Sequence, residues 1–97
     1  MKEEKLFIVS YDITDPKRWR KIFKILNGYG NWLQLSVFQC QMNELKKEKL
    51  VSELDTIIDK SKDQILFIDV GLKNKVKTKV MSIGKKFQMI EKKPMIF

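Results

Sequence analysis

Two kinds of apolar pattern alternate along this chain, and their order constrains the fold more than any other feature of the sequence. Residues 5–13 form a β-rich apolar run of the kind found in buried strands. Residues 16–27 instead repeat their apolar side chains at helical spacing. A strand followed at once by an amphipathic helix predicts a domain in which helices pack on a sheet.

The first predicted helix has clear signals at both ends. Asp15 provides a side-chain oxygen that can cap it, and Pro16 suits its first turn. Asn27-Gly28 and Gly30 are expected to end it, because glycine readily adopts the left-handed conformation of a helix cap. Its apolar stripe consists of Trp19, Ile22, Phe23 and Leu26. The other positions are mostly lysine and arginine, so we expect one face on the sheet and a basic face toward solvent.

The later segments continue the alternation. Residues 31–42 alternate apolar and polar side chains, which predicts one long strand with a kink or bulge near residues 37–39, or a strand split in two. We expect a second helix over residues 43–60, for which Asn43 is the cap. A further apolar strand is expected over residues 64–70.

This order predicts an α+β fold of the ferredoxin-like βαββαβ type, with two helices on one face of an antiparallel sheet and a single domain over residues 1–97. Residues 76–83 alternate weakly, and residues 95–97 could form a last short strand. The uncovered face of the sheet would be too apolar to remain in contact with water. A homodimer that packs sheet on sheet about a two-fold axis is the simplest way to cover it.

The chain is basic at both ends. Its net charge is +8, and residues 73–97 carry eight lysines and one glutamate, whereas the middle is slightly acidic. This distribution suits a phosphate backbone bound on one side of the protein, although a lysine-rich proteome would give a similar total. Alternate lysines over residues 73–79 could follow a duplex backbone, but edge strands also use lysine to resist aggregation.

The chain has no histidine, and this absence narrows the possible chemistry. Ser–His and Cys–His nucleophiles, imidazole general bases and histidine-ligated zinc are excluded. Hydrolysis would need hydroxyls, or carboxylates that hold a hard cation. Cys40, the only cysteine, is expected to be a packing residue. Without an internal disulfide, a signal core or a membrane-spanning run, we expect a cytoplasmic protein that does not contact membranes.

Asp12 is the best candidate for chemistry because it directly follows the first strand, and Tyr11 beside it can hydrogen-bond or stack. In a dimer whose two-fold axis lies near this strand end, two Asp12 carboxylates would meet. They could hold Mg²⁺ or another divalent cation together with water and phosphate oxygens. Alternatively, Asp12 caps the turn before Pro16. Asp15 could be a second ligand, but its place before proline favours a helix cap.

The two arginines of the chain, Arg18 and Arg20, lie close to Asp12 in sequence. Either could bind phosphate through two parallel hydrogen bonds from its planar guanidinium group. They are two positions apart, so they do not share a helix face. In the second strand region, Ser36 and the neighbouring Gln34 could orient Asp12 or a bound water, or could form an exposed edge. Trp32 could stack on a base or lie at a subunit interface, although packing at the core or its rim is the plainer interpretation.

Several of these segments together resemble the Cas2 family, the small CRISPR-associated proteins of the spacer-acquisition machinery. The resemblance rests on Tyr11-Asp12-Ile13, the arginine-bearing helix through Leu26, Tyr29-Gly30, Gln34-Leu35-Ser36-Val37-Phe38, the strand at 65–70 and Val80-Met81-Ser82-Ile83-Gly84-Lys85. It covers nearly the whole chain and is strongest over residues 7–38. Trp32 departs from the pattern because many relatives carry arginine there.

The resemblance implies a homodimer with a swapped C-terminal strand, antiviral defence through spacer acquisition, and dimers of the CRISPR integrase as partners. It implies a metal-dependent endonuclease whose substrate is either single-stranded RNA, as an endoribonuclease, or duplex DNA. The family's catalytic and metal-binding position corresponds to Asp12, and the second carboxylate of the site would be Asp12 of the other subunit. Residues expected around that site are Tyr11, Arg18, Arg20, Ser36 and Phe38.

Three alternatives stay open. One is a non-catalytic architectural clamp for DNA, because a single carboxylate per chain is sparse for hydrolysis and no general base is evident. Another is a toxin-like ribonuclease or a transcription-regulator domain that shares the fold. The last is a small-molecule-binding module, which the strongly basic tail disfavours.

Overall fold

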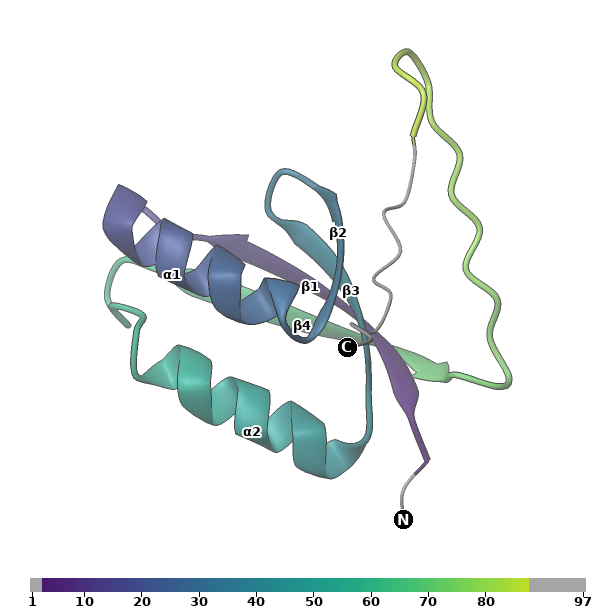
Figure 1. Cartoon of the computed structure of the whole chain (residues 1–97), viewed down its shortest axis with the longest axis horizontal. Coiled ribbons are helices and arrows are strands. Elements are labelled where there is room, and N and C mark those ends of the chain that lie inside the picture. The colour runs from purple at the N-terminus through teal and green to yellow at the C-terminus, as the bar shows by residue number, and fades with distance from the viewer. Residues whose placement is uncertain (1–2, 88–97) are drawn as a thin grey trace, which may run out of the picture.

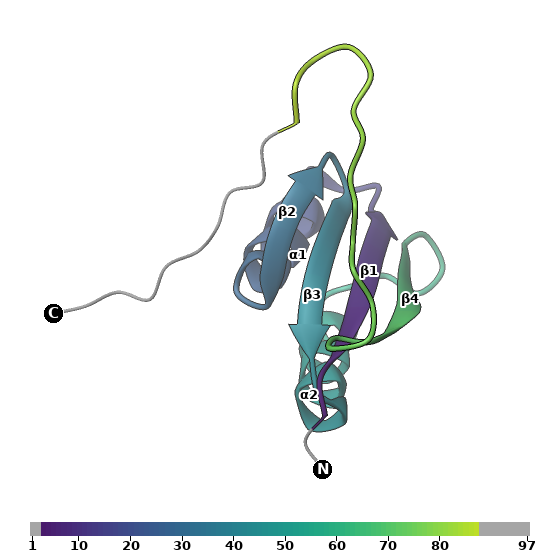
Figure 2. The same cartoon turned by 90° about the vertical axis from the view of Figure 1, so that its right-hand side faces the viewer.

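The structure, a computed structural model, describes residues 3–87 and contains four strands and two helices within that range. In chain order they are β1 (Lys5–Asp12), α1 (Pro16–Asn27), β2 (Gly30–Gln34), β3 (Val37–Met42), α2 (Glu44–Asp55) and β4 (Gln64–Leu72). The strands form one sheet in the order β2-β3-β1-β4, and every neighbouring pair is antiparallel. Both helices lie on the same face of this sheet (Figures 1 and 2). The predicted α+β, ferredoxin-like arrangement is confirmed.

The core lies between the sheet and the two helices. Alternate residues of β1 and β3 point toward the helices, as expected from the two-residue period of a strand. The buried core consists of Phe7, Val9, Tyr11, Phe38, Cys40 and Met42 from the sheet and Ile22, Leu26, Leu50 and Leu54 from the helices. The opposite face, here called the open face, therefore carries Ile8, Ser10 and Asp12 of β1, Val37 and Gln39 of β3, and Leu66 and Ile68 of β4.

The ends of α1 agree with the sequence prediction because its signals are local. The Asp15 carboxylate accepts a hydrogen bond of 3.0 Å from the Arg18 backbone N–H, so Asp15 is the N-cap. Gly28 ends the helix as expected, but with a right-handed φ of −81° and not in the left-handed conformation, and its backbone N–H donates a hydrogen bond to the Ile25 carbonyl.

The second helix ends earlier than predicted. Asn43 caps it as expected, but the last helical residue is Asp55. Thr56 is the C-cap, and its backbone N–H bonds to the Glu53 carbonyl. The Asp59 carboxylate then accepts hydrogen bonds from the backbone and hydroxyl of Ser61 in the turn before β4. Helical spacing alone extends the prediction to residue 60 because Ile57 and Ile58 still pack against the core.

The single long strand over residues 31–42 is wrong, and the alternative of two strands is confirmed. The chain turns at Leu35, which has a positive φ of 38°, and at Ser36, not at residues 37–39. The two halves pair with each other, with Trp32 opposite Phe38. A tight hairpin leaves the alternation of side chains almost unbroken, so the pattern does not reveal the turn.

The chain after β4 forms no strand within the described residues. Residues 76–83, predicted as a weak strand, instead run as an extended coil across the open face toward the hairpin tip (Figure 2). The short strand predicted at 95–97 lies outside the described residues, and strand swapping stays a prediction. Among residues 3–87, no helix is long and apolar enough to cross a bilayer.

Candidate active site

Asp12 is the last residue of β1, and its exposed side chain belongs to the open face. Tyr11 points into the core, so the alternation of the strand directs Asp12 away from the helices. Residue pairing between β1 and β3 stops at Ser10, whereas Asp12 still pairs with Gln64 of β4. Within the described chain, the Asp12 carboxylate makes no hydrogen bond or ion pair, so it is available to a cation, water or substrate.

A single chain offers few metal ligands. No group of three or more histidine, cysteine, aspartate or glutamate side chains comes together among residues 3–87. Asp12 therefore fits a divalent cation only if a second copy of the chain, water and phosphate oxygens complete the ligand set. Mg²⁺ accepts such a set, since it commonly binds one or two carboxylates and keeps several waters.

Arg18 is half-buried and bound to two neighbouring side chains. Its Nε donates a hydrogen bond of 2.8 Å to Asp63, and its Nη2 contacts both Asp63 and the Thr14 hydroxyl. The Asp63 side chain is 0% exposed. The Arg18 guanidinium holds the pKa of Asp63 well below its usual range; burial opposes this, while the N–H groups of Asp59 and Thr14 add to it. The predicted phosphate-binding role of Arg18 stays a prediction, but the structure shows it in an internal ion pair.

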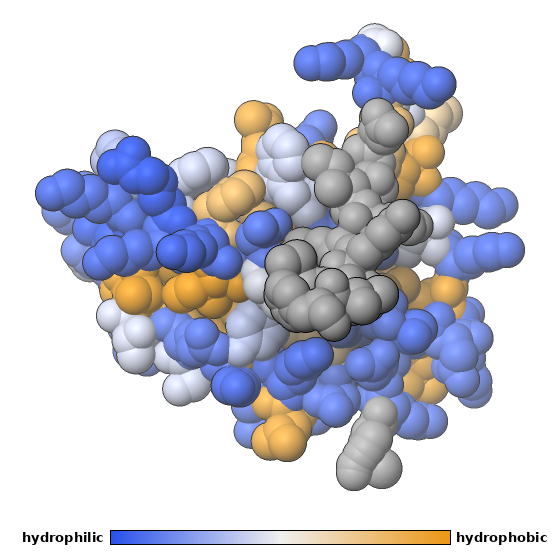
Figure 3. Space-filling model, viewed as in Figure 1, coloured by the Kyte–Doolittle hydropathy of each residue, from blue (hydrophilic) through white to orange (hydrophobic). Residues whose placement is uncertain are grey.

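Arg20 points to solvent on the opposite side of α1. It belongs to a set of exposed basic side chains, here called the basic face of α1, which consists of Lys17, Arg20, Lys21 and Lys24. Figure 3 shows this hydrophilic surface over α1, above an apolar strip between the two helices. Charges at this density on one helix face suit a phosphate backbone.

Tyr11 and Phe38 lie in the core beneath the site. Their ring centroids are 6.2 Å apart, and Tyr11 also contacts Trp19 at 6.3 Å. Burial raises the pKa of the Tyr11 phenol, and the nearby Ser36 side chain counteracts part of this shift. The Tyr11 hydroxyl has no hydrogen bond of good geometry to any described residue. These rings can shape the site from below, but they do not reach the open face.

Ser36 and Trp32 belong to the β2–β3 hairpin. The Ser36 carbonyl accepts a 3.1 Å hydrogen bond from the Tyr11 N–H, which ties the hairpin turn to the end of β1. Trp32 is 39% exposed, packs edge-on against Phe23 and donates its indole N–H to the Leu35 carbonyl. Trp32 therefore packs at the rim of the core. Cys40 is fully buried, as predicted.

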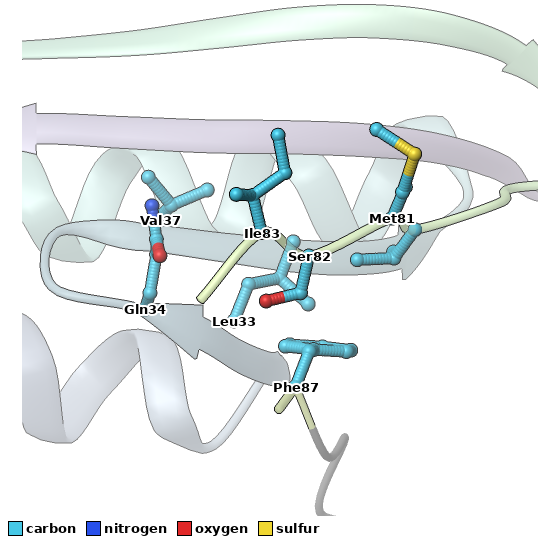
Figure 4. A pocket seen from close by; sticks show the side chains of 8 residues that line it. Leu33, Gln34, Val37, Met81, Ser82, Ile83 and Phe87 are labelled. Carbon is cyan, nitrogen blue, oxygen red and sulfur yellow. The ribbon is translucent and has the colours of Figure 1, made fainter. Parts of the chain in front are cut away.

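The open face exposes apolar side chains on β4, including Ile68 at 50%. The tail adds more, since Ile83 is 89% exposed where residues 80–87 pass the hairpin. Figure 4 shows Met81, Ser82 and Ile83 beside Leu33 and Val37, with a shallow pocket of about 310 Å³ between them. Apolar surface of this extent supports the predicted contact with a second chain.

Sequence reasoning missed Asp63. It lies directly before β4, in a turn that reads as an ordinary polar loop. The sequence carries only an indirect signal for this pair. The segments that form β1 and β4 both have buried-strand patterns, and if they pair antiparallel, an acid just before β4 can meet an arginine just after β1.

A model of the CRISPR-associated protein Cas2 family matches residues 5–78. The chain is 44% identical over 93 residues to a protein of Rhodospirillum rubrum named CRISPR-associated endoribonuclease Cas2 1, covering 96% of this chain and 91% of the relative. It is 35% identical over 97 residues to CRISPR-associated endonuclease Cas2 of Halalkalibacterium halodurans, covering 95% and 99%.

A crystal structure of a Cas2 protein has the same fold. It superposes with a TM-score of 0.72 at 26% identity and covers 84% of this chain and 88% of the other. The region that the family model matches, residues 5–78, includes all six helices and strands and the start of the tail.

Proposed function

The chain belongs to the Cas2 family of CRISPR-associated proteins, and from that premise we propose that it is a homodimeric, metal-dependent endonuclease of spacer acquisition. The observation that carries this proposal is the position of Asp12. Its exposed carboxylate lies at the end of the central strand, on the sheet face that the helices leave open. Relatives named endoribonuclease and endonuclease support phosphodiester hydrolysis as the reaction.

The proposed dimer pairs two open faces. Burying the apolar side chains of β4 would provide the driving force for association. The basic, partly apolar tail lies over the same face, and we propose that its C-terminal part adds a strand to the partner's sheet. A two-fold axis near the end of β1 would bring one Asp12 from each subunit together.

In the proposed mechanism, the two Asp12 carboxylates would hold a divalent cation, most simply Mg²⁺. When bound, such a cation supplies charge neutralisation and an acidified water. Arg20 is free to contact the phosphate, and the basic face of α1 holds the flanking backbone. With no histidine in the chain, proton transfer from the attacking water falls to solvent or to a carboxylate.

We propose that the dimer works in the cytoplasm with dimers of the CRISPR integrase and holds RNA or duplex DNA. The distribution of positive charge supports a polyanionic ligand. Family membership favours this role over a toxin-like ribonuclease or a transcription-regulator domain of the same fold.

A non-catalytic architectural scaffold is the second candidate. It is favoured because each chain would contribute one carboxylate, Asp12, to the proposed site, and because no three-ligand cluster occurs among residues 3–87. In that case the dimer would hold DNA for the integrase, and Asp12 would not be needed for binding.

Cleavage assays with purified protein distinguish the two. Single-stranded RNA and duplex DNA are incubated with and without Mg²⁺, using the wild type, Asp12→Asn and Glu48→Gln, which removes one exposed charge from α2. The nuclease proposal expects Mg²⁺-dependent cleavage that only Asp12→Asn abolishes. Cleavage that survives in Asp12→Asn would refute the mechanism, and spacer integration that survives without cleavage would favour the scaffold.

A further inference from the structure

The carboxylate of Asp63 gathers three separate segments of the chain. It accepts hydrogen bonds from the backbone and hydroxyl of Thr14, at 3.2 and 3.4 Å, in the loop after β1. From α1 it accepts the Nε and Nη2 groups of Arg18, at 2.8 and 3.3 Å. The backbone N–H of Asp59, in the loop after α2, donates a fifth at 2.9 Å. A buried carboxylate with this many donors is a rigid junction.

This junction lies next to the proposed catalytic carboxylate. Asp12 pairs with Gln64, the residue that follows Asp63, and Thr14 comes two residues after Asp12. Residue pairing with β3 has already ended at Ser10, and beyond it the Tyr11 N–H donates a hydrogen bond to the Ser36 carbonyl in the turn before β3. Asp63 therefore holds Thr14, in the loop that follows Asp12, at the point where the pairing between β1 and β4 ends.

The same junction holds the Arg18 guanidinium against Asp63, and 25% of the Arg18 side chain stays exposed. Two of its nitrogens are bound to an enclosed carboxylate, and a phosphate that recruited Arg18 would leave that carboxylate buried without its counter-charge. Arg20, two residues later, is exposed and has no such partner among the described residues. The two arginines thus differ in what they can contact.

We infer that Asp63 is a positioning residue for Asp12, and that Arg18 acts on the reaction through Asp63 and not by gripping phosphate. The inference rests on the proposed cleavage at Asp12. A catalytic carboxylate must be held within a fraction of an ångström of its working position, and a displacement of about 1 Å can cost about 100-fold in rate.

Steady-state cleavage kinetics test the first part, with Asp63→Asn, Arg18→Gln and Arg18→Lys measured below their melting temperatures. We expect kcat to fall between about 10- and 100-fold in Asp63→Asn and Arg18→Gln, with KM for RNA little changed, because substrate binding does not use these groups. Arg18→Lys, which can still pair with Asp63 and disturbs the fold least, should recover part of the rate. Wild-type kcat in Asp63→Asn would overturn the inference.

The salt dependence of RNA binding tests the second part without any need for cleavage. Arg20→Gln should reduce the slope of log K against log salt by about 0.7, the value for one phosphate contact on a single strand. Arg18→Gln should leave the slope unchanged, and an equal reduction in both variants would overturn the claim about Arg18. If Asp12→Asn still cleaved, the proposed function and the positioning of Asp12 would fail together, while the salt slopes would still decide the role of Arg18.

Discussion

Replacing Gly30 by alanine tests the close contact between β2 and β3, the hairpin that flanks the open face. A methyl group on Gly30 would lie 2.5 Å from the Gln39 carbonyl oxygen and 2.5 Å from the Cys40 Sγ. Its third neighbour, the Cys40 Cα, would be 3.0 Å away. Two of these three atoms are backbone of a paired strand, so the strain can be relieved only by moving β2 away from β3.

Overpacking by one carbon costs about 1–3 kcal/mol, and the backbone contacts place Gly30→Ala at about 2–3 kcal/mol. For a chain of this size, that corresponds to a fall in the melting temperature of about 10–20 °C. Thermal and urea unfolding followed by circular dichroism would measure both values. Gly28→Ala is the matched control, since Gly28 has φ of −81° and its added methyl would meet the Ile25 carbonyl oxygen at 3.3 Å. Equal stability of the two variants would refute this account of the hairpin.

Three further predictions concern the dimer, acid stability and the second helix. Ile68→Lys places a charge on the open face and should convert the proposed dimer to a monomer in sedimentation at micromolar concentration. Ser52→Lys, on the exposed side of α2, should leave the dimer intact. A dimeric Ile68→Lys variant would contradict the proposed interface. The folded state holds the pKa of Asp63 below its unfolded value of about 3.9. The ionised Asp63 therefore contributes fully to the free energy of unfolding above that pH, and this contribution is lost as the pH falls further. Melting temperatures between pH 5 and 2 should therefore fall more steeply for the wild type than for Asp63→Asn, and parallel curves would contradict the role of the ion pair. Asn43→Ala removes the cap of α2 and should cost about 0.5–2 kcal/mol in urea unfolding, with an unchanged value counting against the cap.

The sequence predicts best what depends on neighbouring residues. The limits of α1 follow from Asp15, Pro16 and Gly28, whose effects are local, and the structure confirms them. The first and last strands are also found, because their apolar runs identify a buried sheet whatever the pairing. The α+β architecture follows from the order of these elements.

What the sequence does not reveal depends on contacts between distant segments. The Leu35–Ser36 turn is hidden because a tight hairpin preserves the alternation of a single strand. The Arg18–Asp63 pair joins residues 45 positions apart, so the arginine reads as a phosphate ligand until the fold supplies its partner. Asp12 is predicted at the end of the first strand, where the structure places it. In the proposed dimer its second carboxylate would come from another chain, which the pattern of a single sequence does not place.

Counting the divalent cations bound per chain tests most directly the claim that two Asp12 carboxylates share one metal. Mn²⁺, which accepts the same oxygen ligands as Mg²⁺ and is visible by electron paramagnetic resonance, can be titrated into the wild type and Asp12→Asn in the presence of a short RNA. We predict one tightly bound ion for every two chains, lost in Asp12→Asn. One ion per chain, or binding that persists without the Asp12 carboxylate, would contradict the shared site.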